Sequence, residues 1–213
     1  MDKGLSSLIT ETDKLVKNYL EYFNLLKGKY KWGPSDPRLT SIGLTGNILV
    51  SHLINLTLFK TTLSQQDWWA KNLGMSSKEI IQHYADEYTI HIKSGLYVFF
   101  YGGVESSIRE LYSLYFKKEP PMNFSKVYKE FFIKINEENL DSLFTFMSSV
   151  RNLIHSNGVY SKEDGNLLFR DRVFQVKKGV KVDFFTPYLI LEIYQDLFLA
   201  LKKIIESESI KTL

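Results

Sequence analysis

The sequence contains no cysteine. The chain therefore has no disulfide, no thiolate zinc site, no iron–sulfur cluster and no cysteine nucleophile. It also lacks an excess of either charge, because 27 Lys and Arg stand against 24 Asp and Glu and leave a net charge of +3. Such a small excess does not indicate a protein that is basic throughout. With 44% hydrophobic residues, the chain has ample material for a folded core, which excludes global disorder.

The N-terminal segment lacks the apolar stretch of a signal peptide and is typical of an amphipathic helix. We therefore expect a soluble, cytoplasmic protein with no membrane partner. A length of 213 residues predicts a single domain over 1–213. Within it, residues 1–75 form N-terminal helices and a loop of unassigned role, and residues 76–208 form the remaining core.

Helical periodicity dominates the chain. It predicts helices over residues 5–26, 41–60, 78–116, 124–135, 138–155 and 188–205. Ser76 or Ser77 is the expected N-cap of the third helix, and Gly102-Gly103 is the expected place for a break or kink in it. Asn157-Gly158 is the expected end of the fifth helix, because these residue types adopt the left-handed conformation easily.

After the fifth helix the apolar period changes from 3.6 to 2 residues. This predicts a β-hairpin over about 167–185, with strands 167–176 and 180–185 and a turn at Lys177-Lys178-Gly179. Thr186 and Pro187 then start the last helix as N-cap and first helical residue. The expected fold is mainly α, an up-and-down helical bundle with a β-hairpin inserted before the last helix.

Arg151 is the sharpest anomaly in the sequence. On a helix of 3.6 residues per turn it falls inside an apolar stripe, and His155 falls on the margin of that stripe. The stripe consists of Leu140, Leu143, Phe144, Met147, Val150 and Ile154. A guanidinium on a buried face needs a carboxylate partner or an oligomer interface, since it cannot lose its proton. One interpretation is a structural ion pair with a helix-terminal histidine; the other is a catalytic pair on one face.

The string Arg151-Asn152-Leu153-Ile154-His155 resembles the Arg-Asn…His signature of the HEPN superfamily of helical-bundle proteins. Residues 103–112 are similar to the preceding core helix of that family, which often carries an acidic residue facing the motif. The resemblance covers about residues 78–205. It implies a homodimer and a metal-independent endoribonuclease of toxin or defence type, with no metal or cofactor. Arg151, His155, Asn152 and Glu105 would form its catalytic site, and an antitoxin or regulatory protein is a further expected partner.

In such a reaction His155 would take the 2′-hydroxyl proton or protonate the leaving 5′-oxygen, while Arg151 would stabilise the developing phosphorane charge. The alternative is a non-catalytic HEPN-like module that dimerises or binds RNA, protein or a small ligand. A third class is a small-molecule sensor that uses the Trp- and Tyr-rich N-terminal region.

The sequence allows two interpretations of Glu105. It reaches Arg151 or His155 across a helix interface, or it forms an ordinary intrahelical pair with Arg109, four residues away.

The positive charge is concentrated in the predicted hairpin. Its phosphate-binding candidates are Arg170, Arg172, Lys177, Lys178 and Lys181, and strand alternation puts Arg170 and Arg172 on one face. The alternative is a solvated edge that charge protects from aggregation.

The remaining histidines and tryptophans give weaker signals. His91 lies in line with Tyr84 and Tyr88, which favours a core histidine over a metal ligand, and His52 is isolated in the sequence. Because adjacent tryptophans point to different faces of a helix, at least one of Trp68 and Trp69 is expected in the core.

Overall fold

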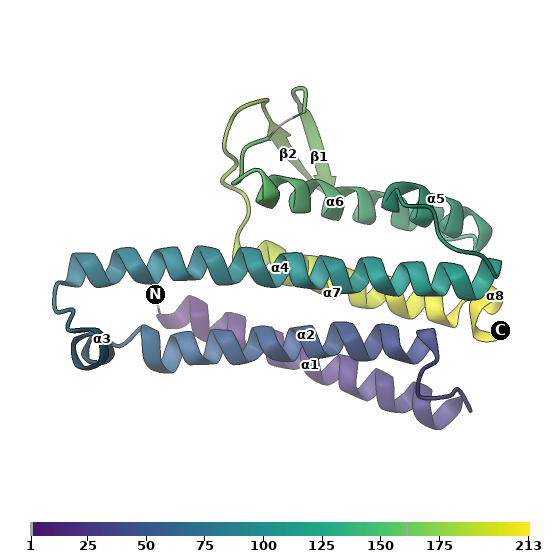
Figure 1. Ribbon diagram of the computed structural model, residues 1–213, viewed down its shortest axis with the longest axis horizontal. Helices are drawn as coiled ribbons and strands as arrows, with labels where there is room; N and C mark the ends of the chain where they lie inside the picture. Colours follow the sequence, from purple (N-terminus) through teal and green to yellow (C-terminus); the bar gives the residue numbers. More distant parts are fainter. Residues whose placement is uncertain (1, 161) are drawn as a thin grey trace.

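The computed structural model describes residues 2–160 and 162–213. Four long helices run side by side; the first three alternate in direction, and the last runs parallel to the third (Figure 1). They are α1 (Asp2–Lys29), α2 (Pro37–Leu58), α4 (Lys78–Phe116) and α7 (Pro187–Glu206). The mainly α fold with a hairpin before α7 is confirmed.

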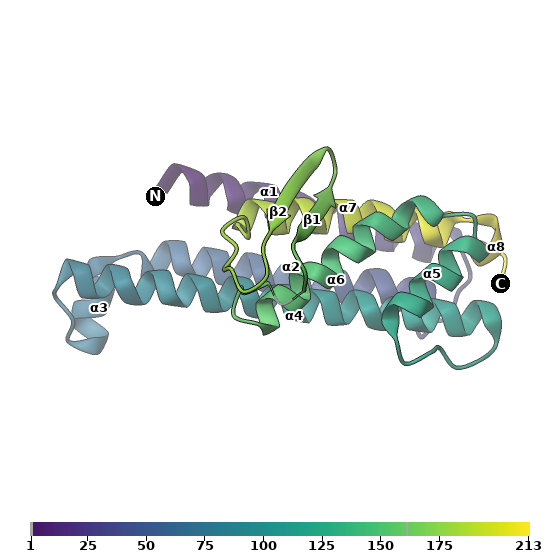
Figure 2. The same cartoon turned by 90° about the horizontal axis from the view of Figure 1, so that it is seen from above.

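Shorter elements cover one side and both ends of this bundle. The helices α5 (Phe124–Lys134) and α6 (Asp141–His155) lie on one side, with a 3₁₀ turn at Glu138–Leu140 between them. Seen from above, α6 runs diagonally over α4 and α7, and the hairpin stands on α6 (Figure 2). A π-helical turn, η1 (Phe59–Leu63), and α3 (Gln66–Leu73) follow α2 at one end, while α8 (Glu208–Lys211) ends the chain at the other.

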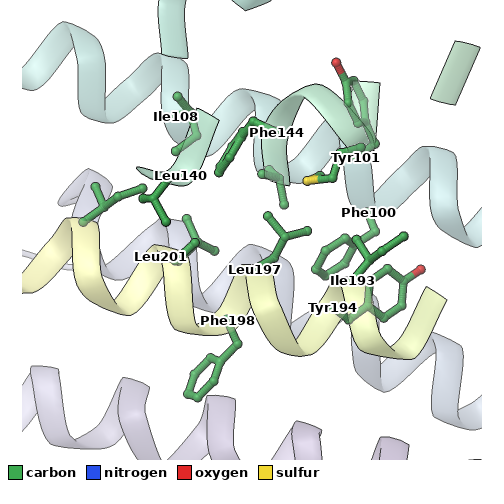
Figure 3. Close-up of a cluster of buried hydrophobic side chains, with 14 of the residues drawn as sticks. Phe100, Tyr101, Ile108, Leu140, Phe144, Ile193, Tyr194, Leu197, Phe198 and Leu201 are labelled. Carbon is green, nitrogen blue, oxygen red and sulfur yellow. The ribbon is translucent and has the colours of Figure 1, made fainter. Parts of the chain in front are cut away.

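One hydrophobic cluster fills the bundle from α1 to α8. Its centre is α7, whose buried residues lie on several faces. α1, α2 and α6 pack against it, and Phe100 of α4 contacts its Tyr194, with ring centroids 3.9 Å apart. Leu197 and Leu201 point toward α6, whereas Phe198 points the opposite way (Figure 3). There the Phe198 ring contacts Tyr19 and Tyr22 of α1, with ring centroids 4.5 and 5.9 Å away. Residues of the N-terminal third thus share the core of the remaining chain.

The third predicted helix is confirmed in length, but the break expected within it is wrong. α4 continues through Gly102 and Gly103. Gly103 faces α2, and a Cβ at this position would lie only 2.7 Å from Cδ1 of Ile48. The glycine therefore lets two helices approach closely and does not interrupt either. The expected cap is Ser77, whose Oγ accepts a hydrogen bond from the Ile80 amide.

The hairpin exists, but its predicted register is wrong. The strands are β1 (Gly165–Phe169) and β2 (Arg172–Val176), so the turn falls at Arg170-Asp171 and not at residues 177–179. Arg170 adopts a φ of 53°, which lets the chain reverse without a glycine. Residues 180–185 form no second strand; in the described part of the chain, Lys181 pairs with Val159 as an isolated bridge.

The prediction for the adjacent tryptophans is confirmed, whereas the prediction for His91 is wrong. Trp69 is buried and donates its Nε1–H to the Leu63 carbonyl at 2.7 Å, which confirms that one of the two tryptophans lies in the core. The prediction for His91 is wrong, because its side chain is exposed on the part of α4 that extends toward α3. The buried histidine is instead His52, with 3% of its surface exposed.

The helical stretch Pro37–Leu63 is long and apolar enough to cross a membrane by length and composition alone. It carries no charged side chain from Leu39 to Phe59. In the structure α2 packs against α1 and α4, and its buried residues include Ile42 and Leu49. Of its most apolar window, 28% is buried in the bundle. Core helices of soluble proteins can have the same length and composition, so this one stretch is only weak evidence of a membrane span.

Candidate functional site

A polar cleft of about 570 Å³ lies between α4, α5 and α6. It contains three of the four residues of the predicted catalytic set. Tyr101 and Glu105 line it from α4, and the first two turns of α5 form the opposite wall. The face of α6 supplies Arg151 and Asn152 together with a row of hydroxyl side chains, Thr145, Ser148 and Ser149.

Arg151 is half-buried on the wall of this cleft. Its guanidinium carbon lies 5.8 Å from the ring centroid of Tyr101, and Nη1 donates to the Asn152 side-chain oxygen at 3.2 Å. Among the residues that the structure describes, Arg151 forms no ion pair. A carboxylate partner was one of the two environments that the sequence predicted for this guanidinium. Instead, the guanidinium contacts the Tyr101 ring and the Asn152 side-chain amide and faces the open cleft.

Tyr101 fixes the orientation of the cleft wall behind Arg151. Its hydroxyl lies 3.2 Å from Ser148 Oγ, which itself donates to the Phe144 carbonyl at 2.9 Å, so Tyr101 is the donor of the pair. Burial raises the pKa of Tyr101, and the hydrogen bond with Ser148 and the charge of Arg151 only partly oppose this shift. The phenol is thus neutral at pH 7 and remains a donor.

Glu105 pairs with Arg109 and not with the α6 motif. Nε and Nη2 of Arg109 both donate to Glu105 Oε1, at 2.9 and 2.7 Å. No hydrogen bond joins Glu105 to Arg151 or His155 in the described part of the chain. Of the two interpretations of Glu105, the intrahelical pair with Arg109 is the one seen in the structure. Its carboxylate nevertheless lines the cleft that Arg151 lines.

Arg109 also holds the beginning of α5 in place. Its Nη1 donates to the Pro121 carbonyl at 2.6 Å and Nη2 to the Met122 carbonyl at 2.8 Å. Directly after them, Asn123 caps α5 by accepting from the amides of Ser125 and Lys126. The wall of the cleft opposite α6 is thereby fixed to α4.

His155 is exposed and does not line the cleft. It is the last residue of α6, where the chain leaves the helix through Asn157 and Gly158 with φ values of 52° and 81°. The Gly158 amide donates to the Leu153 carbonyl at 2.7 Å, as in a Schellman ending. Arg151 and His155 are therefore one helical turn apart, one at the cleft and the other beyond its end.

The cleft has an excess of positive charge that the sequence patterns did not single out. Lys129 and Lys162 line it together with Arg151, against the single carboxylate of Glu105. Lys129 has only a loose contact with Asp141, at 3.9 Å, and both lysines are exposed. A polar surface of this charge suits an anionic group such as a phosphate. In the sequence, the hydroxyl side chains of Thr145, Ser148 and Ser149 on one face of the fifth predicted helix could have indicated a polar cleft at this face.

The positions of Arg170 and Arg172 in the hairpin differ from those that strand alternation predicted. Arg170 lies in the turn, so it shares no strand face with Arg172, and it pairs with Asp196 and Glu192 of α7. Arg172 also pairs with Glu192. These arginines fasten the hairpin to α7 and their charges are locally balanced. Lys178 pairs with Glu163, whereas Lys177 and Lys181 are exposed without an ion pair in the described residues.

No group of three His, Asp or Glu side chains among the described residues lies close enough together to hold a metal ion. Comparison of the chain with protein-family models, with curated proteins and with solved structures finds no match in any of the three.

Proposed function

We propose that this chain is a HEPN-like, cytoplasmic RNA-binding protein that cleaves RNA without a metal ion. The observation that carries the proposal is the state of Arg151. Its guanidinium has no carboxylate partner among the described residues, lines a cationic polar cleft, and lies one turn from an accessible imidazole. An unneutralised guanidinium at such a wall is suited to a phosphate oxygen.

The chemistry divides between two side chains. Arg151 binds the scissile phosphate and stabilises the charge that develops on it. His155 transfers the proton, either from the 2′-hydroxyl or to the leaving 5′-oxygen. Lys129 and Lys162 hold the neighbouring phosphates, and Asn152 keeps the guanidinium in place through its 3.2 Å hydrogen bond.

Because His155 lies beyond the end of the cleft, the RNA strand must leave the cleft across the last turn of α6. A second copy of the chain, as the HEPN resemblance implies, would bring a second Arg151 and His155 to the same strand. Toxin or defence activity, restrained by an antitoxin or regulatory protein, belongs to the same proposal.

The test is incubation of the purified protein with a structured RNA in the presence of EDTA. Cleavage should fall at least about 100-fold in Arg151→Ala and in His155→Ala. His83→Ala, which removes an exposed histidine on α4 away from the cleft, and Arg172→Ala are the matched controls and should cleave normally. Cleavage that survives in His155→Ala overturns the catalytic assignment.

The position of His155 outside the cleft favours a second candidate, a non-catalytic RNA-binding module. In that case the wild-type protein binds RNA but leaves it intact. Arg151→Ala and Lys129→Ala should then weaken binding, while His155→Ala should leave the dissociation constant unchanged. A filter-binding or fluorescence-anisotropy titration of the same RNA separates the two functions.

A further inference from the structure

Two adjoining cavities lie at the end of the bundle that carries α3, on elements other than α5 and α6. The outer cavity, of about 450 Å³, lies between η1 and the first half of α4. The inner one, of about 70 Å³, lies between α2, α4 and the beginning of α7. Leu5 and Phe59 line both, so the two cavities adjoin at these side chains.

The π-helical turn η1 shapes the outer cavity. The Ser64 amide donates to the Phe59 carbonyl at 2.9 Å, five residues back, which is the wide hydrogen bond of a π-helix. Ser64 Oγ donates to the Lys60 carbonyl at 2.6 Å and strengthens the turn. Such turns are rare and occur frequently at functional sites.

The inner cavity is apolar except for a few hydrogen-bond acceptors. His52 lines it with 3% of its surface exposed, and its Nδ1 has no hydrogen-bond partner. Burial lowers the pKa of His52 to about 4, so the ring is neutral at pH 7 and one of its nitrogens is an acceptor. Asn55 and Thr89 already donate to the Ser51 and Ala85 carbonyls, which leaves their side-chain oxygens as further acceptors.

The outer cavity carries a cation at its rim. Lys60 is half-buried there and forms no ion pair within the described residues. Polar side chains of Ser64, Gln65 and Gln82 surround it, while Ile81 and Ala85 make the floor apolar. His52 and Lys60 are eight residues apart, about 12 Å along a helix. The two cavities together therefore offer a cation, an apolar middle and a deep acceptor.

We propose that these cavities bind a small amphipathic carboxylate whose apolar chain ends in a hydroxyl group. Lys60 holds the carboxylate, Phe59 and Ile81 contact the chain, and His52 accepts the hydrogen bond of the terminal hydroxyl. A buried polar atom without a partner gains most from a ligand that supplies the missing hydrogen bond. The residues that line this site are separate from those proposed to bind and cleave RNA, so the proposal does not rest on the proposed function.

The test uses 10-hydroxydecanoate, decanoate and 1-decanol as probes, with binding to the full chain measured by titration calorimetry. 10-Hydroxydecanoate should bind saturably at one site per chain and at least about tenfold more tightly than decanoate. Lys60→Met should weaken both carboxylates at least about tenfold and leave decanol unchanged. Lys71→Met, which removes an exposed charge on α3, is the matched control and should bind like wild type.

Hydrogen exchange should show protection by the ligand within residues 52–65 and 81–92. His52→Phe should abolish the difference between 10-hydroxydecanoate and decanoate. If His52→Phe does not fold, the affinities of the three probes for wild type and for Lys60→Met test the proposal without it. Absence of saturable binding, equal affinity for the two carboxylates, or equal affinity in Lys60→Met overturns the proposal.

Discussion

Two nitrogens of Arg109 donate to one carboxylate oxygen of Glu105, while the same guanidinium donates to two carbonyls of the loop before α5. The side chains of Arg109 and Glu105 are 23% and 29% exposed. Arg109 thus connects α4 to the start of α5, which forms the wall of the polar cleft opposite α6.

We expect Arg109→Met to lower the free energy of unfolding by about 2 kcal/mol, because several partly buried hydrogen bonds are lost at once. Glu105→Gln should cost less, about 1 kcal/mol, since Pro121 and Met122 keep their donor. Urea denaturation of both variants gives the comparison. A loss in Glu105→Gln as large as in Arg109→Met would mean that Glu105 has another partner across the cleft.

Arg151→Ala should change stability by less than about 1 kcal/mol. Its guanidinium forms one hydrogen bond to a neighbouring side chain and one ring contact, and no carboxylate is left unpaired when it is removed. Thermal unfolding measures this. The result matters for the cleavage assay, because lost activity in a variant of unchanged stability is a loss of chemistry. A drop of several kcal/mol would show Arg151 to be structural.

Arg38 is the buried arginine that this fold needs for stability. It donates to both carboxylate oxygens of Asp36 and to the Ile210 carbonyl, and its guanidinium lies 4.1 Å from the Trp32 ring. Burial opposes ionisation of Asp36, but the hydrogen bonds and charge of Arg38 outweigh it and lower the pKa of that carboxyl.

We expect Arg38→Met to destabilise the protein by about 3 kcal/mol, since it leaves the partly buried Asp36 carboxylate without its cation and removes the hydrogen bond to the C-terminal turn. Lys14→Met, which removes an exposed partner of Glu11, should change stability by less than about 0.5 kcal/mol. Denaturation followed by tryptophan fluorescence measures both. Similar losses in the two variants would contradict the role given to Arg38.

The hairpin should depend on the two carboxylates of α7 that hold it. Glu192→Gln removes a partner of Arg170 and of Arg172, so amide exchange in residues 165–176 should become faster. Global stability should fall by less than about 1 kcal/mol, because these pairs are partly exposed. Glu163→Gln, at an exposed pair with Lys178, is the control and should leave exchange of the strands unchanged.

His52 should make the protein sensitive to mild acid. Its pKa is depressed from 6.5 to about 4 in the folded chain, so the unfolded chain binds more protons between these values. Stability is therefore fully present above pH 6.5 and falls as the pH approaches 4, by roughly 3 kcal/mol. Denaturation at pH 7, 5.5 and 4.5 checks this. His52→Phe should flatten the profile, and His83→Ala, an exposed histidine, should not.

Local signals in the sequence predicted most helix positions. Thr186 caps α7 and Pro187 is its first residue, as the Thr-Pro pair indicates. The apolar stripe of residues 124–135 is buried along α5, and Asn157-Gly158 ends α6 with two left-handed residues. Each of these features is set within a few residues of the chain, which is why spacing and residue type are enough to predict it.

Features that depend on distant packing were not predictable in the same way. The hairpin turn required a positive φ at Arg170, which no glycine or asparagine announces. Burial of His52 and exposure of His91 follow from which faces of α2 and α4 meet the other helices. α2 carries no charged side chain from Leu39 to Phe59, so its sequence does not mark which face is buried. The lack of a carboxylate for Arg151 depended on Arg109 occupying Glu105, a competition between two helices.

The unbroken course of α4 has a thermodynamic consequence. Among the described residues, α4 is the one element that lines both the polar cleft, through Tyr101, and the inner cavity, through Tyr88. About 20 Å of continuous helix joins these positions. A helix without a hinge can transmit a tilt along its length, so we expect a ligand that tilts one end of α4 to affect the other end as well. For the two proposed ligands, linkage would make such coupling reciprocal: the factor by which the carboxylate alters RNA affinity would equal the factor by which RNA alters carboxylate affinity.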